Sequence, residues 1–166
     1  MGTAVIIGAG HGLSASLARH LHARDMQVVL AARDTSDLGA LGEETQAMLV
    51  DCDARRRDDM SRLFDIVDKI GSDLEVAVYN PSARVRGPIE EVDAEAVENA
   101  ILVSAYGAFL MAQHAARRML PLGRGAMLFT GASAGVKGFA NSASFAMGKF
   151  ALRGLCQSLA RELHPK

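Results

Sequence analysis

Short apolar runs alternate with longer segments of helical period along this chain. Each run is apolar at nearly every position rather than at every second one. Continuous runs of this kind predict strands of a parallel sheet that is covered on both faces. The predicted strands span residues 3–8, 27–32, 46–51, 74–80 and 125–131.

The segments between these runs have apolar residues at helical spacing. Helices are predicted over residues 13–24, 58–70, 93–120 and 142–163. Alternation of strands and helices predicts a doubly wound, Rossmann-type α/β fold, with strand order 3-2-1-4-5 and right-handed crossovers. We expect one domain over residues 1–166. A sheet of this kind often has six or more strands, so we also expect the C-terminal strands to be missing.

Composition excludes several functional classes. The chain has 166 residues, a net charge of −1 and 49% hydrophobic residues, which is typical of a globular domain. No basic excess indicates a nucleic-acid partner. Cys52 and Cys156 lie far apart, so neither a zinc site nor another metal site is predicted. No apolar run is long enough to span a membrane, and no signal segment is apparent, so a cytoplasmic location is expected.

Three glycines separate the first predicted strand from the first predicted helix. Gly8, Gly10 and Gly12 stand in the segment IIGAGHGLSASLA. Glycine lets the backbone turn sharply and lets a phosphate group approach the amides at a helix N-terminus. The spacing G-x-G-x-x-G fails because residue 13 is leucine, but G-x-x-x-G fits from Gly8 to Gly12. The segment therefore predicts a dinucleotide-binding turn, with a tight turn that binds nothing as the alternative.

The end of the second predicted strand bears on the choice of coenzyme. A carboxylate that binds the ribose 2′-hydroxyl is expected there, but the sequence reads AARD, with Arg33 before Asp34. An arginine can stack on adenine and pair with a 2′-phosphate, so NADP is favoured over NAD. His11 lies in the glycine turn and could add to that site. The alternatives are a solvated arginine and a neutral loop histidine.

A lysine interrupts an apolar stripe on the last predicted helix. Phe145, Lys149, Leu152, Cys156 and Leu159 recur at helical spacing and so share one face. The lysine either faces a cavity, where it would have a function, or extends past its neighbours to reach water.

With these features, the chain resembles the short-chain dehydrogenase/reductase family over nearly its whole length. The family's opening T-G-x-x-x-G-[IL]-G is similar to IGAGHGLS, which includes Leu13. Its D-V after the third strand is similar to Asp53–Ala54, and the resemblance implies that Asp53 binds the adenine amino group. Its N-N-A-G after the fourth strand appears as YNPS, which keeps only Asn80. Coenzyme contacts are thus expected from Gly8, Gly10, His11, Gly12, Leu13, Arg33, Asp53, Ala54, Asn80 and Lys149.

The catalytic residues that the resemblance implies are mostly replaced. The family is expected to use an asparagine in the long helix, a serine, a tyrosine 13 residues later and a lysine four residues after the tyrosine. LVSAYGAF is similar to its V-N-x-x-G-x-F and puts Ser104 at the asparagine position. The serine position is Ala132 and the tyrosine position is Phe145, so only Lys149 is kept. The resemblance implies that Lys149 binds the nicotinamide ribose and that Ser104 supports a water.

Two functions are compatible with this pattern. The first is an NADP-dependent oxidoreductase that acts on a small carbonyl, hydroxyl, enone or imine substrate. Its proton is expected from Lys149, from a water near Ser104 or from a group in the missing C-terminal part. The second is a catalytically inactive NADP-binding protein, either a redox sensor or a partner subunit. The apolar circumference of the helices over 93–120 and 142–163 predicts a homodimer or homotetramer that packs them against their copies.

Overall fold

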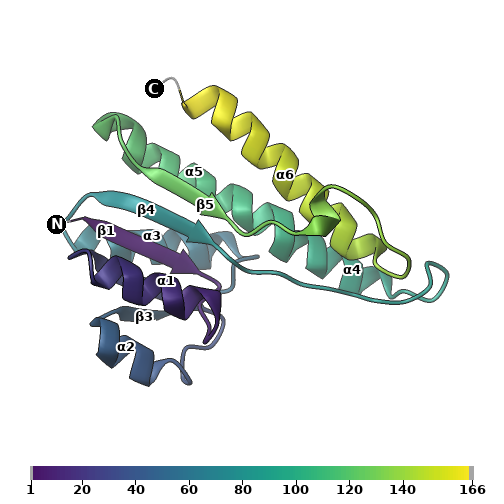
Figure 1. Ribbon diagram of the computed structural model, residues 1–166, viewed down its shortest axis with the longest axis horizontal. Helices are drawn as coiled ribbons and strands as arrows, with labels where there is room; N and C mark the ends of the chain where they lie inside the picture. Colours follow the sequence, from purple (N-terminus) through teal and green to yellow (C-terminus); the bar gives the residue numbers. More distant parts are fainter. Residues whose placement is uncertain (1, 165–166) are drawn as a thin grey trace.

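The computed structural model describes residues 2–164 and has the predicted doubly wound architecture (Figure 1). Five parallel strands form one sheet in the order β3-β2-β1-β4-β5, which confirms the predicted order. The strands are β1 (Thr3–Ile7), β2 (Gln27–Ala32), β3 (Met48–Asp51), β4 (Leu74–Tyr79) and β5 (Ala126–Phe129). The helices are α1 (Leu13–His22), α2 (Gly39–Thr45), α3 (Arg57–Lys69), α4 (Ala94–Ile101), α5 (Gly107–Met119) and α6 (Ala143–Leu163).

Strand β1 lies at the centre of the sheet and explains why the apolar runs are continuous. Every residue of β1 is buried. Val5 pairs with Val29 on one side and with Ala77 on the other. Alternate side chains of a strand point to opposite faces, so a strand covered on both sides needs apolar residues at every position.

Two separate cores cover the two faces. Helices α3 and α5 pack against one face, where Phe64 and Met111 are completely buried. Helices α1 and α2 cover the other face, where Ala18 and Leu41 pack against β1 and β2. Helix α6 contacts α4 and the segment that follows α4, on the same side of the sheet as α5 (Figure 1).

The prediction of a single helix over residues 93–120 is wrong, because the structure divides this segment. α4 and α5 are joined by a π-helical segment, Leu102–Tyr106. Within that segment the carbonyl of Val103 accepts a hydrogen bond of 2.5 Å from the Tyr79 hydroxyl at the end of β4. A side chain at Gly107 would collide with the same hydroxyl. The close approach of β4 therefore accompanies the local widening of the helix, a feature that often marks functional sites.

Helix α2 was not predicted, and two short 3₁₀ turns also escaped prediction, at Leu120–Leu122 and Ser133–Gly135. α2 is seven residues long and ends at Gln46, whose φ of 50° is left-handed. So short a helix has too few turns to display an apolar period. None of the helices within residues 2–164 is long and apolar enough to cross a membrane.

Candidate coenzyme and substrate site

Residues that follow three neighbouring strands meet at the carboxyl edge of the sheet and are joined through Asn80. Its Nδ2 donates to the Gly8 carbonyl at 3.1 Å and to Ser14 Oγ at 2.8 Å. Its Oδ1 accepts from Thr130 Oγ1 at 2.7 Å. Asn80 therefore fixes the turn after β1 relative to the ends of β4 and β5. In doubly wound sheets this edge is where ligands bind.

The glycine turn leaves its backbone open on one side and packed on the other. Gly8 has a φ of 77°, and a Cβ there would lie 2.5 Å from the backbone nitrogen of Pro81. A Cβ at Gly10 or at Gly12 would meet nothing within 4 Å. Gly12 precedes α1, and no side chain caps its first turn. These open amides, with that of the exposed Leu13, fit a phosphate group at a helix N-terminus.

His11 lies within this turn and Arg33 follows β2, and both are exposed. His11 Nε2 is 3.0 Å from Asp37 Oδ2, so its ring is engaged with the loop after β2. Thr35 donates to Asp51 from its backbone nitrogen and its hydroxyl, which fixes the same loop against β3. No ion pair of Arg33 occurs among residues 2–164.

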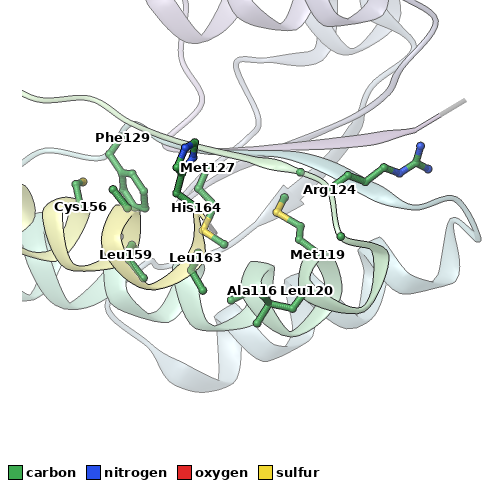
Figure 2. Close-up of a pocket in the computed structure, with 13 residues that line it drawn as sticks. Ala116, Met119, Leu120, Arg124, Met127, Phe129, Cys156, Leu159, Leu163 and His164 are labelled. Carbon is green, nitrogen blue, oxygen red and sulfur yellow. The ribbon is translucent and has the colours of Figure 1, made fainter. Parts of the chain in front are cut away.

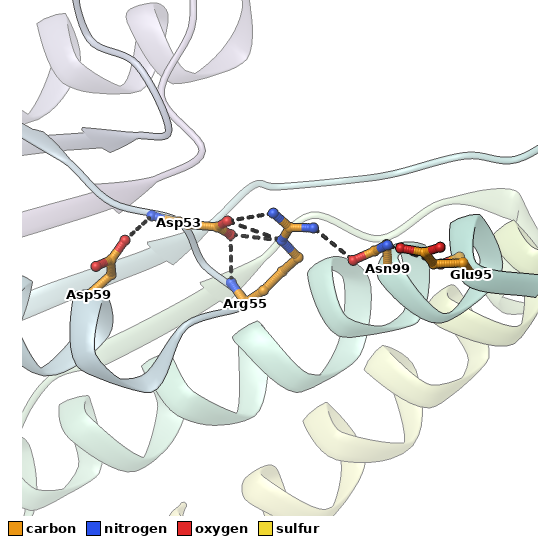
Figure 3. A network of polar contacts seen from close by, with 5 residues as sticks. All are labelled: Asp53, Arg55, Asp59, Glu95 and Asn99. Atoms are coloured by element: carbon orange, nitrogen blue, oxygen red, sulfur yellow. Dashed lines mark hydrogen bonds and ion pairs between the residues drawn. The ribbon is translucent and has the colours of Figure 1, made fainter.

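Asp53, the expected adenine contact, is held by a neighbouring arginine (Figure 3). Arg55 donates to both carboxylate oxygens, with Nη2 2.6 Å from Oδ2 and Nε 3.0 Å from Oδ1. These hydrogen bonds hold the pKa of Asp53 below its usual range, and the charge of Arg33 adds a smaller contribution. Arg55 also donates to Asn99 Oδ1 of α4 at 2.7 Å. Any donor from adenine therefore has to share Asp53 with Arg55. The adjacent Ala54 is buried.

Lys149 is buried within the site. Its side chain is 3% exposed, which excludes the arrangement in which it reaches past its neighbours to water. Nζ donates to the Thr130 carbonyl at 2.8 Å and lies 5.9 Å from the centre of the Phe145 ring. Burial, and to a smaller extent the charge of Arg84, lower the pKa of Lys149. An ammonium with one backbone partner retains two donors for a ligand.

The positions around Lys149 hold few polar groups. Phe145 is 8% exposed, and Ala132 follows β5 in extended backbone. Ser104 is 1% exposed, and its hydroxyl has no hydrogen-bond partner within residues 2–164. It packs beside Gly148, where a Cβ would lie 2.7 Å from that of Ser104. An unpartnered buried hydroxyl is uncommon and is consistent with a water or ligand that completes it. Ser133, the residue after Ala132, has a hydroxyl but is exposed.

The loop between β4 and α4, over residues 80–93, also contributes to the site. The Ser144 hydroxyl donates to the Val85 carbonyl at 2.9 Å and accepts from the Val85 nitrogen at 3.2 Å. These bonds place the Arg84 guanidinium 3.9 Å from the centre of the Phe145 ring. Arg84 and the Thr130 carbonyl were both missed from the sequence. The loop has no periodic pattern from which its path could be predicted. Every residue has a backbone carbonyl, so the sequence does not single out that of Thr130.

A cavity of about 440 Å³ lies elsewhere, between α5, β5 and α6 (Figure 2). Its lining is mainly apolar and includes none of the predicted site residues. The lining residues are Ala116, Met119, Leu120, Gly123, Arg124, Gly125, Met127, Phe129, Cys156, Leu159, Ala160, Leu163 and His164. Among residues 2–164, no group of three histidine, cysteine, aspartate or glutamate side chains could hold a metal ion.

Comparison with known proteins identifies the family. Residues 2–166 match the family model described as short chain dehydrogenase. The chain belongs to the short-chain dehydrogenase/reductase family. A crystal structure of a short-chain dehydrogenase from Rhodopseudomonas palustris has a TM-score of 0.92 at 32% identity, covering 99% of this chain and 79% of that one. A metagenomic short-chain oxidoreductase in complex with NADP has a TM-score of 0.93 at 28% identity, covering 99% and 77%.

Curated short-chain dehydrogenase/reductase relatives are longer than this chain. The 3-oxoacyl-[acyl-carrier-protein] reductase MabA of Mycobacterium tuberculosis is 29% identical over 160 residues, which cover 96% of this chain and 62% of that protein. Cis-4-hydroxycyclohexanecarboxylate dehydrogenase of Sinomonas cyclohexanicum is 30% identical over 162 residues, which cover 95% and 65%. The chain thus spans somewhat less than two thirds of the length of these relatives.

Proposed function

We propose that this protein is an NADP-dependent oxidoreductase that works without a catalytic tyrosine and acts on a small carbonyl, hydroxyl, enone or imine substrate. The observation that carries the proposal is the buried ammonium of Lys149. It lies 2.8 Å from the Thr130 carbonyl, and Thr130 is hydrogen-bonded to the same Asn80 that holds the glycine turn. A buried charge is costly unless it has partners, so a lysine at this edge of the sheet is explained by a ligand with hydroxyl groups.

The chain offers a contact for each part of the coenzyme. The amides of Gly10, Gly12 and Leu13 would hold the pyrophosphate, and Arg33 would hold the 2′-phosphate. NADP in a related structure supports this choice over NAD. Asp53 would contact adenine by sharing its carboxylate with Arg55. Lys149 would bind the ribose hydroxyls next to the nicotinamide.

The proton would come from Lys149 rather than from an aromatic hydroxyl. When bound, the nicotinamide supplies the hydride. Phe145 cannot donate a proton, and nor can Ala132. Burial lowers the pKa of Lys149, which makes its ammonium a stronger acid. In a carbonyl reduction, Lys149 would supply the proton that the substrate oxygen takes up. A water beside the free hydroxyl of Ser104 would then return a proton to the amine.

Coenzyme titration of the Lys149→Met variant tests this proposal. The change keeps the side-chain length and removes the charge, so we expect NADPH to bind about 10- to 100-fold more weakly. Lys137→Met serves as the matched control, because Lys137 is exposed, lies against the Phe139 ring and is not among the proposed coenzyme contacts. Unchanged NADPH affinity in Lys149→Met would contradict the assignment of this lysine to the coenzyme.

A second function, an inactive NADP-binding protein, is favoured by the same positions. Phe145 and Ala132 together remove both hydroxyls that orient and protonate a substrate oxygen in the family. Proton transfer is typically worth about 10²–10⁴-fold in rate, so its loss alone slows turnover without abolishing it. A redox sensor or a partner subunit would bind NADPH with no turnover of any carbonyl substrate.

Self-association is part of the same proposal. Phe109 of α5 and Phe150 of α6 are 42% and 46% exposed, and Met147 is 52% exposed. Ala143 and Ala151 are also exposed on α6. We propose that α4, α5 and α6 pack against their copies in a homodimer or homotetramer. Sedimentation at micromolar concentration tests this, and a monomer would contradict it.

A further inference from the structure

Two cations converge on one aromatic ring at the catalytic position. The Arg84 guanidinium carbon lies 3.9 Å from the centre of the Phe145 ring, and Lys149 Nζ lies 5.9 Å from the same centre. Phe145 therefore does more than lack a hydroxyl, because its ring supports a permanent positive charge through a cation–π interaction. The guanidinium thus stands beside the position where the family has its proton donor.

The position of Arg84 is fixed by the backbone that follows it. The next residue, Val85, is bonded at its nitrogen and its carbonyl to the Ser144 hydroxyl. Gly87 donates from its nitrogen to the Asn141 carbonyl at 3.2 Å. Two points of attachment to the start of α6 thus hold this part of the loop beside Phe145.

Neither cation has an anionic partner. Within residues 2–164, no carboxylate forms an ion pair with Arg84 or with Lys149. Lys149 is buried and Arg84 is exposed, and the charge of Arg84 lowers the pKa of Lys149 less than burial does. Like charges held near one another are unfavourable unless an anion lies close to them. The arrangement therefore favours a negatively charged group in the site.

We propose that Arg84 binds a carboxylate of the substrate, and that this site selects carboxylate-bearing substrates. The planar fork of arginine matches a planar carboxylate with two parallel hydrogen bonds. A carboxylate, with one charge, is favoured over a phosphate because Lys149 is assigned to the ribose, which leaves one cation for the substrate. The inference rests on the proposed function for the position of the coenzyme, and it names the substrate class of that site.

A matched pair of ligands tests the role of Arg84. Phenylpyruvate and its methyl ester differ by one charge, and both are titrated into the protein saturated with NADP⁺, so that no reduction occurs. We expect the acid to bind at least about tenfold more tightly than the ester, as for a lost hydrogen bond between charged groups. In Arg84→Gln the affinity for the acid should fall to that for the ester. The ester and NADP⁺ should bind as before, and Arg84→Lys should retain part of the preference.

Arg86→Gln is the control, because Arg86 is an exposed arginine of the same loop and should change neither affinity. Equal binding of acid and ester by the unmutated protein would overturn the proposal. So would a loss of NADP⁺ affinity in Arg84→Gln, since Arg84 would then contact the coenzyme. Tighter binding of phenylphosphonate than of phenylpyruvate would overturn the assignment to a carboxylate.

The same titrations without NADP⁺ separate this inference from the proposed function. If the protein fails to bind NADP⁺ but still prefers the acid through Arg84, the proposed function is wrong and the carboxylate site is supported. If the coenzyme binds but the protein binds the acid no more tightly than the ester, the carboxylate site is wrong and the coenzyme site is supported.

Discussion

Asn80, which follows β4, and Phe145, on α6, have opposite surroundings. Asn80 makes hydrogen bonds with Gly8, Ser14 and Thr130, so that each of its polar atoms has a partner. Around Phe145 the hydroxyls of the family's tyrosine and serine are absent, and the buried Ser104 hydroxyl has no partner. Asn80 thus lies in a closed polar network, whereas Arg84 and Lys149, beside Phe145, form no ion pair within residues 2–164.

This difference bears separately on coenzyme binding and on catalysis, two properties that usually occur together in the family. A network in which every member is satisfied keeps one geometry, because an unpaired buried group is costly. The turn that would bind a coenzyme is therefore rigid before any ligand arrives. The surroundings of Phe145 lack this closure, and under the proposed function groups of a substrate would complete them. Binding can be retained while the chemistry changes.

The largest expected effect comes from restoring the missing hydroxyls. We expect Phe145→Tyr with Ala132→Ser to raise the rate of carbonyl reduction about 100-fold, since a positioned proton donor is worth about 10²–10⁴-fold. The double change is needed because a tyrosine alone lacks the group that orients the substrate oxygen. Each single variant is the control, with a smaller gain. If the unmutated protein already reduces ketones at ordinary rates, about 1–10³ s⁻¹, another acid replaces the tyrosine fully. The claim that Phe145 slows the reaction would then be wrong.

The two sides of the glycine turn should respond differently to the same small side chain. Gly8→Ala places a Cβ 2.5 Å from the Pro81 nitrogen at a φ of 77°, so we expect a loss of about 2–4 kcal/mol in the free energy of unfolding. Gly10 has no left-handed φ and has open space around it, so Gly10→Ala should leave the fold intact. It should weaken NADPH binding about tenfold, or 1.4 kcal/mol. Denaturation and coenzyme titration measure both effects, and equal stability of the two variants would contradict this account of the turn.

Arg33 tests the choice between coenzymes. Arg33→Ala should weaken NADPH binding by about 1.5–3 kcal/mol, the range for a lost hydrogen bond to a charged group, and should change NADH binding much less. Arg24→Ala is the control, because Arg24 is exposed at the far end of α1 and bonds only within its own turn. Equal affinity of the unmutated protein for NADPH and NADH would rule out a 2′-phosphate site at Arg33.

The smallest expected effect is a pH dependence of stability. Burial lowers the pKa of Lys149 below its ordinary 10.5, so the unfolded chain binds this proton more tightly than the folded one. Folding is therefore opposed by this group at neutral pH. The penalty fades as pH rises from the lowered folded pKa toward 10.5. Lys149→Met removes the effect, so its stability advantage over the unmutated protein should shrink between neutral pH and pH 10. A difference in the free energy of unfolding that stays constant over this pH range would contradict the prediction.

Much of the fold could be predicted from the sequence, because each strand is continuously apolar and lies between two covered faces. The division of the helix over 93–120 could not, because it accompanies contacts of Val103 and Gly107 with Tyr79, about 25 residues away in the chain. Helix α2 was too short to display a period.

Less of the candidate site could be predicted. The glycine turn and Lys149 stand out because their residue types are unusual for their positions. The hold of Arg55 on Asp53 is a side-chain contact within a loop, and no pattern marks it. Arg84 reaches Phe145 through the path of a loop that the Ser144 hydroxyl determines.

Transfer of deuterium from NADPH tests the central claim most directly. The protein is mixed with NADPH that carries deuterium at both C4 positions and with a panel of carbonyl compounds, half of them 2-oxo acids, and the products are analysed by mass spectrometry. The account predicts one deuterium on the former carbonyl carbon of at least one compound, and a much lower yield with Lys149→Met. Bound NADPH with no deuterium transferred to any compound would contradict it and would favour the inactive NADP-binding protein.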